Sequence, residues 1–188
     1  MTAFVWLNDK SNVDLGFIVQ GASKRPALPG TVDRTLSIPG RNGLWDNGAD
    51  MGARQFVLHC AFITRDAFEL QQKAMGLAAY LVDSYGKPRD LVLRFRERQG
   101  QHFNVRLSGS FDLERIIGLG VFTLPFTAFD PFASADAESL LEETINTSPH
   151  VRQIFTTGNI RTSPVVVLVN QGTTTIQHFR IENEYQIE

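Results

Sequence analysis

The chain has few of the features that mark secreted, membrane-spanning or strongly charged proteins. Its 188 residues contain a single cysteine, Cys60, which excludes an internal disulfide and lies in an apolar alternation typical of a core thiol made in a reducing compartment. The N-terminus lacks the basic and apolar stretches of a signal peptide, and the longest apolar run, 165–169, is far below the roughly 18 residues of a membrane span. The net charge of −2 favours neither sequence-specific nucleic acid nor a membrane as a partner.

Catalytic and metal-binding patterns are also absent from the sequence. The histidines lie far apart and show no metal-ligand spacing, at His59, His102, His150 and His178. No Gly-x-Ser-x-Gly motif marks a serine nucleophile. The stretch from Asp46 to Asp50 lacks the alternating ligands and the distal glutamate of a calcium loop. We therefore expect no cofactor, no metal and no catalytic residue, and we predict that the protein is not an enzyme.

Glycine and proline are instead concentrated in one polar turn. Alternating apolar residues end at Ile38, the run 39–43 favours a turn because its glycines tolerate positive φ, and alternation resumes at Phe56. Residues 45–52 are predicted to loop out. Because Leu44, Trp45 and Met51 are large and apolar, we predict that this loop contacts a neighbouring subunit; the alternative is that they fold back onto the core. The candidate interface residues are Arg41, Asn42, Leu44, Trp45 and Met51.

One helix is predicted after the second of these strands. Its apolar residues recur with helical spacing on one stripe, at Leu70, Ala74, Leu77, Ala78, Leu81 and Tyr85. Thr64 is the expected N-cap. Leu77 and Leu81, in the middle of the stripe, are expected to be buried, whereas Gln72 and Lys73 are expected to be largely exposed.

The remaining pattern predicts strands. Short apolar stretches indicate strands at 4–7, 17–19 and 121–129, and alternation over 91–95 and 103–107 indicates a β-hairpin with one buried face. The predicted fold is mainly β with one prominent helix: a β-sandwich packed against the helix plus a β-hairpin, followed by an incomplete second β domain.

Four arginines lie on or near the predicted hairpin, at Arg94, Arg96, Arg98 and Arg106. One reading is a basic contact for a polyanion or an acidic neighbouring subunit. The other reading is an ordinary solvent face with cross-strand partners such as Glu97. Aromatic residues do not interleave on that face, which argues against a nucleic-acid platform.

Several motifs follow one another in a fixed order along the first 135 residues. They are Ile-Pro-Gly-Arg-Asn-Gly at 38–43, Asp46 and Gly48, Gly52 and Arg54, the helix segment 69–73, Arg-Leu-Ser-Gly at 106–109, Phe-Thr-Leu-Pro-Phe at 122–126 and Asp-Pro-Phe at 130–132. In this order they resemble the distal tail protein family of long-tailed, non-contractile bacteriophages, the siphoviruses. Tyr80 departs from the family pattern, where tryptophan is expected, and Ala128-Phe129 stands where Cys-Pro is frequent.

This resemblance implies a structural virion protein rather than an enzyme. Members of the family form a ring, in the family a hexamer, at the distal end of the tail tube, and the ring is the hub to which the baseplate, the tail tip and often the receptor-binding apparatus attach. The implied partners are further copies of the chain, the tail tube protein, the tail-tip or baseplate hub protein and a receptor-binding protein. The implied location is the virion tail, after synthesis in the cytoplasm of the host bacterium.

The character of the sequence changes after residue 135. We predict a ring-forming domain over 1–135, an acidic linker over 136–149 and a partial second β-rich domain over 150–188. The second domain has strand-like stretches at 151–155, 164–169 and 175–181, too few for a complete sandwich. The chain is therefore expected to be a fragment of a longer protein, or its second unit is completed by another subunit.

A different class of function is also open from the residues alone. A carbohydrate-binding β-sandwich module would use exposed aromatic side chains as stacking surfaces, and Trp6, Trp45 and Phe129 are the candidates. Such a module is expected to be monomeric, whereas a ring protein assembles.

Overall fold

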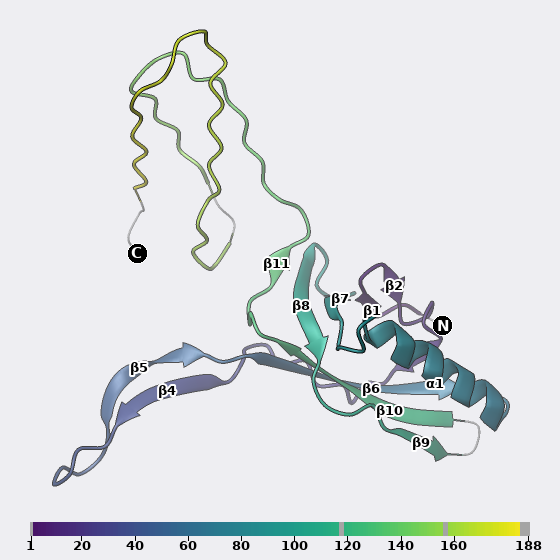
Figure 1. The fold of residues 1–188 in the computed structure, drawn as a ribbon. Helices are drawn as coiled ribbons and strands as arrows, with labels where there is room; N and C mark the ends of the chain where they lie inside the picture. The colour runs from purple at the N-terminus through teal and green to yellow at the C-terminus, as the bar shows by residue number, and fades with distance from the viewer. Residues whose placement is uncertain (1, 117–118, 156–157, 185–188) are drawn as a thin grey trace. The chain divides into compact units, whose positions relative to one another are not determined.

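A computed structural model describes residues 2–116, 119–155 and 158–184. The chain divides into two compact units, Met1–Leu140 and Leu141–Glu188, and the division falls within the predicted linker. The first unit is mainly β, and α1 (Ala67–Leu81) is the single helix of the described residues, which confirms the predicted fold class (Figure 1). The strands are β1 Val5–Leu7, β2 Lys10–Ser11, β3 Phe17–Val19, β4 Thr31–Leu36, β5 Trp45–Met51, β6 Arg54–Ile63, β7 Asp90–Phe95, β8 Gln101–Leu107, β9 Leu113–Ile116, β10 Leu119–Ala128 and β11 Ser134–Ala135.

All but two of these strands form one antiparallel sheet. Its order is β2-β1-β7-β8-β10-β6-β3, with β9 paired to β10 and β11 paired to β8. The strand β10 pairs with β6 along its whole length but with β8 only at Phe126 and Thr127. Because so few residues join them there, the sheet can bend between β8 and β10, so that its two halves face one another over a shared core.

Phenylalanine rings fill this core in two groups. At one end Phe122 contacts Phe62 and Phe17, with ring centroids 4.5 and 5.9 Å apart. At the other end Phe56 of β6 contacts Phe103 of β8, with ring centroids 4.9 Å apart. Contacts of this kind add to the free energy gained by removing the rings from water, so the aromatic core is the main source of stability in this small unit.

The central strands alternate as the sequence predicts. Along β6 the even-numbered residues from Phe56 to Phe62 are buried, and along β7 the odd-numbered residues are buried. Cys60 is fully buried, which confirms the prediction of a core thiol, and burial raises the pKa of that thiol to about 12. At neutral pH the group is therefore a protonated, unreactive part of the core.

The helix begins two residues later than predicted. Asp66, not Thr64, is the N-cap: its carboxylate accepts a hydrogen bond from the backbone N–H of Glu69 at 2.8 Å, and Glu69 accepts one in return from the N–H of Arg65 at 3.0 Å. The first bond satisfies one of the free N–H groups of the first helical turn, and the second ties the Arg65 N–H, just before the cap, to the helix. The helix ends at Leu81, so Tyr85 lies outside the stripe and is 86% exposed.

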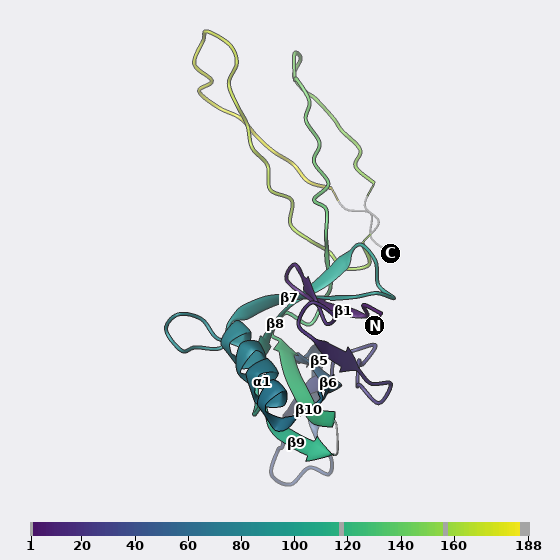
Figure 2. The same cartoon turned by 90° about the vertical axis from the view of Figure 1, so that its right-hand side faces the viewer.

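The stripe itself packs against the sheet. Leu70, Ala74, Leu77 and Leu81 are buried and Gln72 is exposed, as predicted, whereas Ala78 is exposed and Lys73 is half-buried. Figures 1 and 2 show α1 lying along the strands at β6 and β10. A Cβ atom on Gly120 of β10 would lie 2.3 Å from the Cδ1 atom of Leu70, so glycine at this position permits the close approach of the helix.

Replacing Leu77 with alanine should lower the free energy of unfolding by roughly 2–5 kcal/mol, because its side chain is 2% exposed and its removal leaves a cavity. Met75, on the opposite side of α1 and 63% exposed, supplies the matched control: Met75→Ala should change stability by less than about 0.5 kcal/mol. Urea unfolding of both variants measures the difference. Equal effects would mean that the stripe does not carry the packing of the helix.

The second unit differs from the prediction. Its described residues, 141–155 and 158–184, form no helix or strand, so the strands expected there are not seen; positions 156–157 and 185–188 lie outside the described residues. The apolar side chains of those segments are exposed, for example Val165 at 91% and Phe155 at 84%. The segments have strand-like composition but no sheet face to pack on, and a strand without a paired neighbour gains neither ladder hydrogen bonds nor burial. Between two of these segments, the Gly172 N–H donates a hydrogen bond to Oδ1 of Asn170 at 3.0 Å.

Within the described residues no helix has the length and apolar character that a membrane span requires.

Candidate subunit interface

The polar turn that dominates the sequence forms a hairpin of its own. The strands β4 and β5 pair antiparallel, from Thr31 opposite Met51 to Leu36 opposite Trp45, and no other strand of the described residues joins them (Figure 1). The prediction that 45–52 loops out is therefore wrong, since seven of these residues are strand. The alternation that marks a half-buried strand is missing from β5, because neither face of this hairpin is buried, and the register shifts between Asp33 and Thr35.

Every residue of this hairpin is exposed. The apolar candidates Leu44, Trp45 and Met51 are 60, 49 and 43% exposed, and none belongs to the core cluster, so the alternative in which they fold back onto the core is not found. The guanidinium of Arg41 lies over the Trp45 ring, 4.7 Å from its centroid, and Asn42 is exposed beside it in the turn. The structure thus brings the five predicted interface residues together on one hairpin.

Further exposed apolar residues lie on the same hairpin and its approach. They include Leu28 at 66%, Val32 at 56%, Leu36 at 55% and Ile38 at 38% exposed. An ion pair between Arg34 and Asp50 ties β4 to β5. Cross-strand pairs therefore hold together a hairpin whose apolar side chains are exposed and do not belong to the hydrophobic core of the described residues, which is typical of a surface that is covered on assembly.

The four arginines of the predicted basic contact do not share one face of the hairpin β7–β8. Arg94 and Arg106 lie on the face opposite the buried residues. Arg98, in the turn, lies instead toward the core, with its Cζ 5.8 Å from the centroid of the Phe103 ring, and Arg96 lies at the end of β7. Arg94 and Arg106 therefore share a face of the hairpin, whereas Arg96 and Arg98 lie beyond the end of β7.

Aromatic rings accompany two of these arginines, although the sequence pattern shows none on the arginine face of the hairpin. The Cζ of Arg96 lies 5.8 Å from the centroid of Phe4, and that of Arg106 lies 4.8 Å from the centroid of Phe129. These rings come from distant positions in the chain, so no local pattern could have revealed them. Glu97, the expected cross-strand partner, is paired with another residue, Arg25.

An acidic residue missed by the sequence reasoning organises the edge of this hairpin. Asp136 accepts hydrogen bonds from Nε of Arg94 at 2.8 Å and contacts Nδ1 of His102 at 2.9 Å, while its backbone N–H donates to the carbonyl of Gly100 at 2.9 Å. The hydrogen bond from Arg94, and to a lesser extent that of His102, holds the pKa of Asp136 below its usual range. The segment predicted as a linker therefore begins with a residue that is fastened to β8.

Asp136→Asn should reduce stability in a pH-dependent way. Because the pKa is lowered on folding, the advantage of the wild type should be fully present above the ordinary aspartate pKa of about 4 and should disappear as the pH falls through the lowered value. Thermal midpoints measured across that interval test this, with Asp90→Asn as control because Asp90 lies 4.0 Å from its nearest arginine and is largely exposed. A difference that is independent of pH would contradict the role assigned to the Asp136 carboxylate.

The aromatic residues considered for glycan stacking do not come together. Trp6 is half-buried in β1, Trp45 is covered by Arg41 in β5, and Phe129 follows β10 under Arg106. No ring contact joins these three within the described part of the chain. A flat platform of the kind that binds sugar rings is not assembled from them.

Comparison with known proteins places this arrangement in a family. Residues 11–128 match the family model described as a phage tail protein RIFT-related domain. The fold is similar to that of the Dit protein (gp 19.1) of phage SPP1, described as a paradigm of the hub adsorption apparatus in phages that infect Gram-positive bacteria, with a TM-score of 0.60 and 15% sequence identity. That match covers 72% of this chain but only 53% of the SPP1 protein, and no curated protein matches the sequence. The family match confirms the resemblance that the motifs indicate: the chain belongs to the phage tail proteins with a RIFT-related domain.

Proposed function

We propose that this chain is a distal tail protein, which assembles into a closed ring at the end of the tail tube. Membership in a phage tail protein family and the fold shared with SPP1 Dit support a structural role in the tail. The observation that carries the proposal is the hairpin β4–β5, whose apolar side chains around Trp45 are exposed in the protomer. The ring is a hexamer, as the resemblance to the family implies.

A hairpin of this kind suits ring closure. In this proposal the hairpin of one copy contacts a different surface of the next copy, so the contact between copies is head-to-tail. Head-to-tail contacts generate a ring when the rotation between copies closes. Tryptophan and arginine are also among the residue types enriched at the positions that contribute most of the binding energy in protein interfaces.

The role is structural rather than catalytic. The ring would act as a hub between the tail tube protein on one side and the tail-tip or baseplate hub protein on the other, with a receptor-binding protein as a further partner. The protein would be made in the cytoplasm of the host bacterium and then reside in the virion tail. The surfaces that contact these partners would be formed by several protomers of the ring together, since the exposed apolar residues of a single protomer are dispersed over several elements.

The two units would divide the work. Residues 1–135, or the whole unit up to Leu140, would form the ring, the residues up to 149 would act as a linker, and 150–188 would be part of a second β-rich domain. The apolar side chains exposed in that second unit support the view that further polypeptide, from the same or another chain, covers them.

Electron microscopy of the purified chain at high concentration tests the ring directly. Annular particles of uniform diameter, together with a multiple of the 21.0 kDa chain mass by light scattering, are the expected result. A particle that stays monomeric at all concentrations would contradict the proposal and favour a monomeric binding module.

A further inference from the structure

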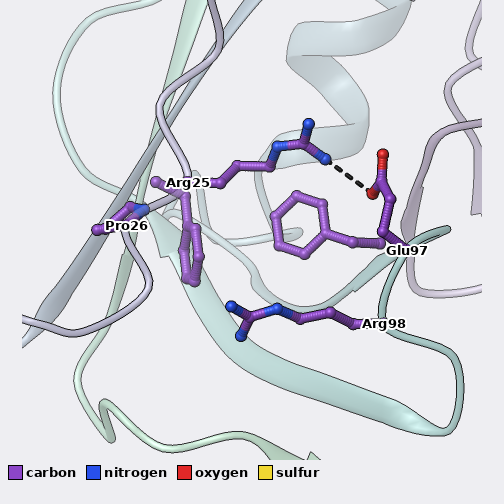
Figure 3. A pocket seen from close by; sticks show the side chains of 6 residues that line it. Arg25, Pro26, Glu97 and Arg98 are labelled. Atoms are coloured by element: carbon purple, nitrogen blue, oxygen red, sulfur yellow. Dashed lines mark hydrogen bonds and ion pairs between the residues drawn. The ribbon is translucent and has the colours of Figure 1, made fainter.

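A cavity of about 290 Å³ opens at one end of the aromatic core, beside the turn that follows β7. It is lined by two aromatic rings, a proline and three charged side chains: Phe56, Phe95, Pro26, Arg25, Glu97 and Arg98 (Figure 3). Nη1 of Arg25 donates to Oε2 of Glu97 at 2.9 Å, so the one carboxylate of the lining is already neutralised. Arg98 forms no ion pair with any described carboxylate, which leaves the cavity apolar with a net positive charge.

A second guanidinium lies in the core next to this cavity. Arg54, two residues before Phe56 on the same face of β6, is only 4% exposed. Its Cζ lies 5.0 Å from the centroid of Phe103, and the Cζ of Arg98 lies 5.8 Å from the same centroid. Phe103 in turn contacts Phe56, with ring centroids 4.9 Å apart. One ring thus connects both guanidiniums to the wall of the cavity.

The charge of Arg54 is not matched within the described residues. Its Nε atom is buried without a hydrogen-bond partner, and no described carboxylate forms an ion pair with its guanidinium. Burial, and secondly the charge of Arg98, lower the pKa of Arg54. An unpaired buried charge destabilises a fold, whereas an apolar residue of the same length would not. A buried charge that lowers the stability of the free protein beside a cavity is typical of a binding site in which a ligand supplies the missing opposite charge.

We propose that this cavity is a binding site for a carboxylate carried on an apolar group, with Arg98 in its lining and Arg54, which does not line it, on the neighbouring Phe103 ring. The apolar part would pack against Phe56 and Phe95 in the cavity, the carboxylate would receive charge-assisted hydrogen bonds from Arg98, and the nearby charge of Arg54 would add to the attraction. A phosphate would satisfy the charges but would leave the aromatic walls without a partner. An acidic side chain next to an apolar residue of a polypeptide has the required chemistry, and so does a small organic acid.

The probe for this site is 3-phenylpropionate, added to the purified full chain at up to about 20 mM because fragments of this size bind in the millimolar range. The acid should raise the thermal midpoint by an amount that grows with the logarithm of one plus the ratio of its concentration to its dissociation constant. Three matched compounds separate the contributions: 3-phenylpropionamide has the ring without the charge, and acetate and inorganic phosphate have charge without the ring. Each should bind at least about tenfold more weakly than the acid.

Two substitutions assign the site to its arginines. Arg98→Gln should abolish most of the stabilisation by the acid. Arg54→Met removes the buried charge but keeps an unbranched apolar chain, so it should raise the midpoint of the free protein by a few degrees and also weaken the response to the acid. Arg96→Gln is the control, since Arg96 lies over Phe4 rather than on the Phe103 ring that Arg54 and Arg98 share, and it should leave the response unchanged.

Several results would overturn the proposal. Equal binding of the acid and the amide would show an apolar pocket only, and preferred binding of phosphate would show a different class of ligand. A lower midpoint for Arg54→Met would show that the buried guanidinium stabilises the free chain. Sedimentation with the acid then identifies the natural source of the carboxylate. If the acid dissociates the assembly, a second copy of the chain supplies the carboxylate; if it does not, a different molecule supplies it. Assembly without the acid tests the ring separately, so failure of one proposal does not decide the other.

Discussion

Replacing Trp45 with alanine should stop the purified chain from forming rings at concentrations where the wild type assembles, while the fold of the protomer stays intact. Trp45 is half-exposed, lies opposite Leu36 and is covered on one side only by Arg41. An aromatic anchor at the centre of an interface contributes about 2 kcal/mol or more, which is roughly a 30-fold change in the dissociation constant of each contact.

The protomer should tolerate this change because the hairpin lies outside the core. None of its residues belongs to the buried cluster, so losing the ring removes only a cross-strand pair that contributes less than about 1 kcal/mol. Light scattering measures the assembly, and the thermal midpoint of diluted protein measures the protomer. Phe68→Ala on α1 is the matched control, since that ring is 72% exposed but lies on another element.

Two results would contradict the assignment of the hairpin to the interface. If Trp45→Ala lowered the thermal midpoint of the protomer strongly and left the particle mass unchanged, the tryptophan would be part of the fold. If Phe68→Ala dissociated the ring into protomers and Trp45→Ala did not, the exposed side of α1 would form the contact between subunits instead.

The sequence predicts those elements of this chain that have one face buried in the core. Strands β6, β7, β8 and β10 and the helix stripe are predicted because each has one side in the core, which imposes a period on the apolar residues. The strand β5 is missed because both of its sides are exposed and no period is imposed on it. The stretches near Val165 are instead predicted as strands but do not form them, since their composition is strand-like but nothing in the described unit pairs with them.

The candidate sites show a different limit. Motif order along the chain is enough to indicate the family, because motifs are local. The environment of Arg54 is not local: its charge is notable only because β6 carries it into the core beside Phe103 and Arg98, which come from another part of the sheet. Asp136 is likewise indistinguishable in the sequence from the other acidic residues of its segment, and only the pairing of β11 with β8 places it beside Arg94. Long-range contacts of this kind need the fold.

A chain that ends at Leu140 should fold with nearly the thermal midpoint of the 188-residue chain and should still form the ring. Every residue of the hydrophobic core lies between Val5 and Ala128, and the hairpin β4–β5 lies within the same unit. The sequence alone suggests ending the chain near Ala135, but Asp136 bonds to Arg94 and His102, so the longer limit keeps β11 fastened to the sheet.

The remaining residues, 141–188, should not fold alone. Their large apolar side chains are exposed, the described part has no helix or strand, and a few unpaired extended segments cannot bury enough surface to offset the entropy of ordering the chain. Circular dichroism of that piece should therefore show an unfolded or aggregated polypeptide. Rings from the 188-residue chain together with a monomeric 140-residue chain would place part of the assembly surface in the second unit, and the ring-forming role would then belong to both units rather than to the first.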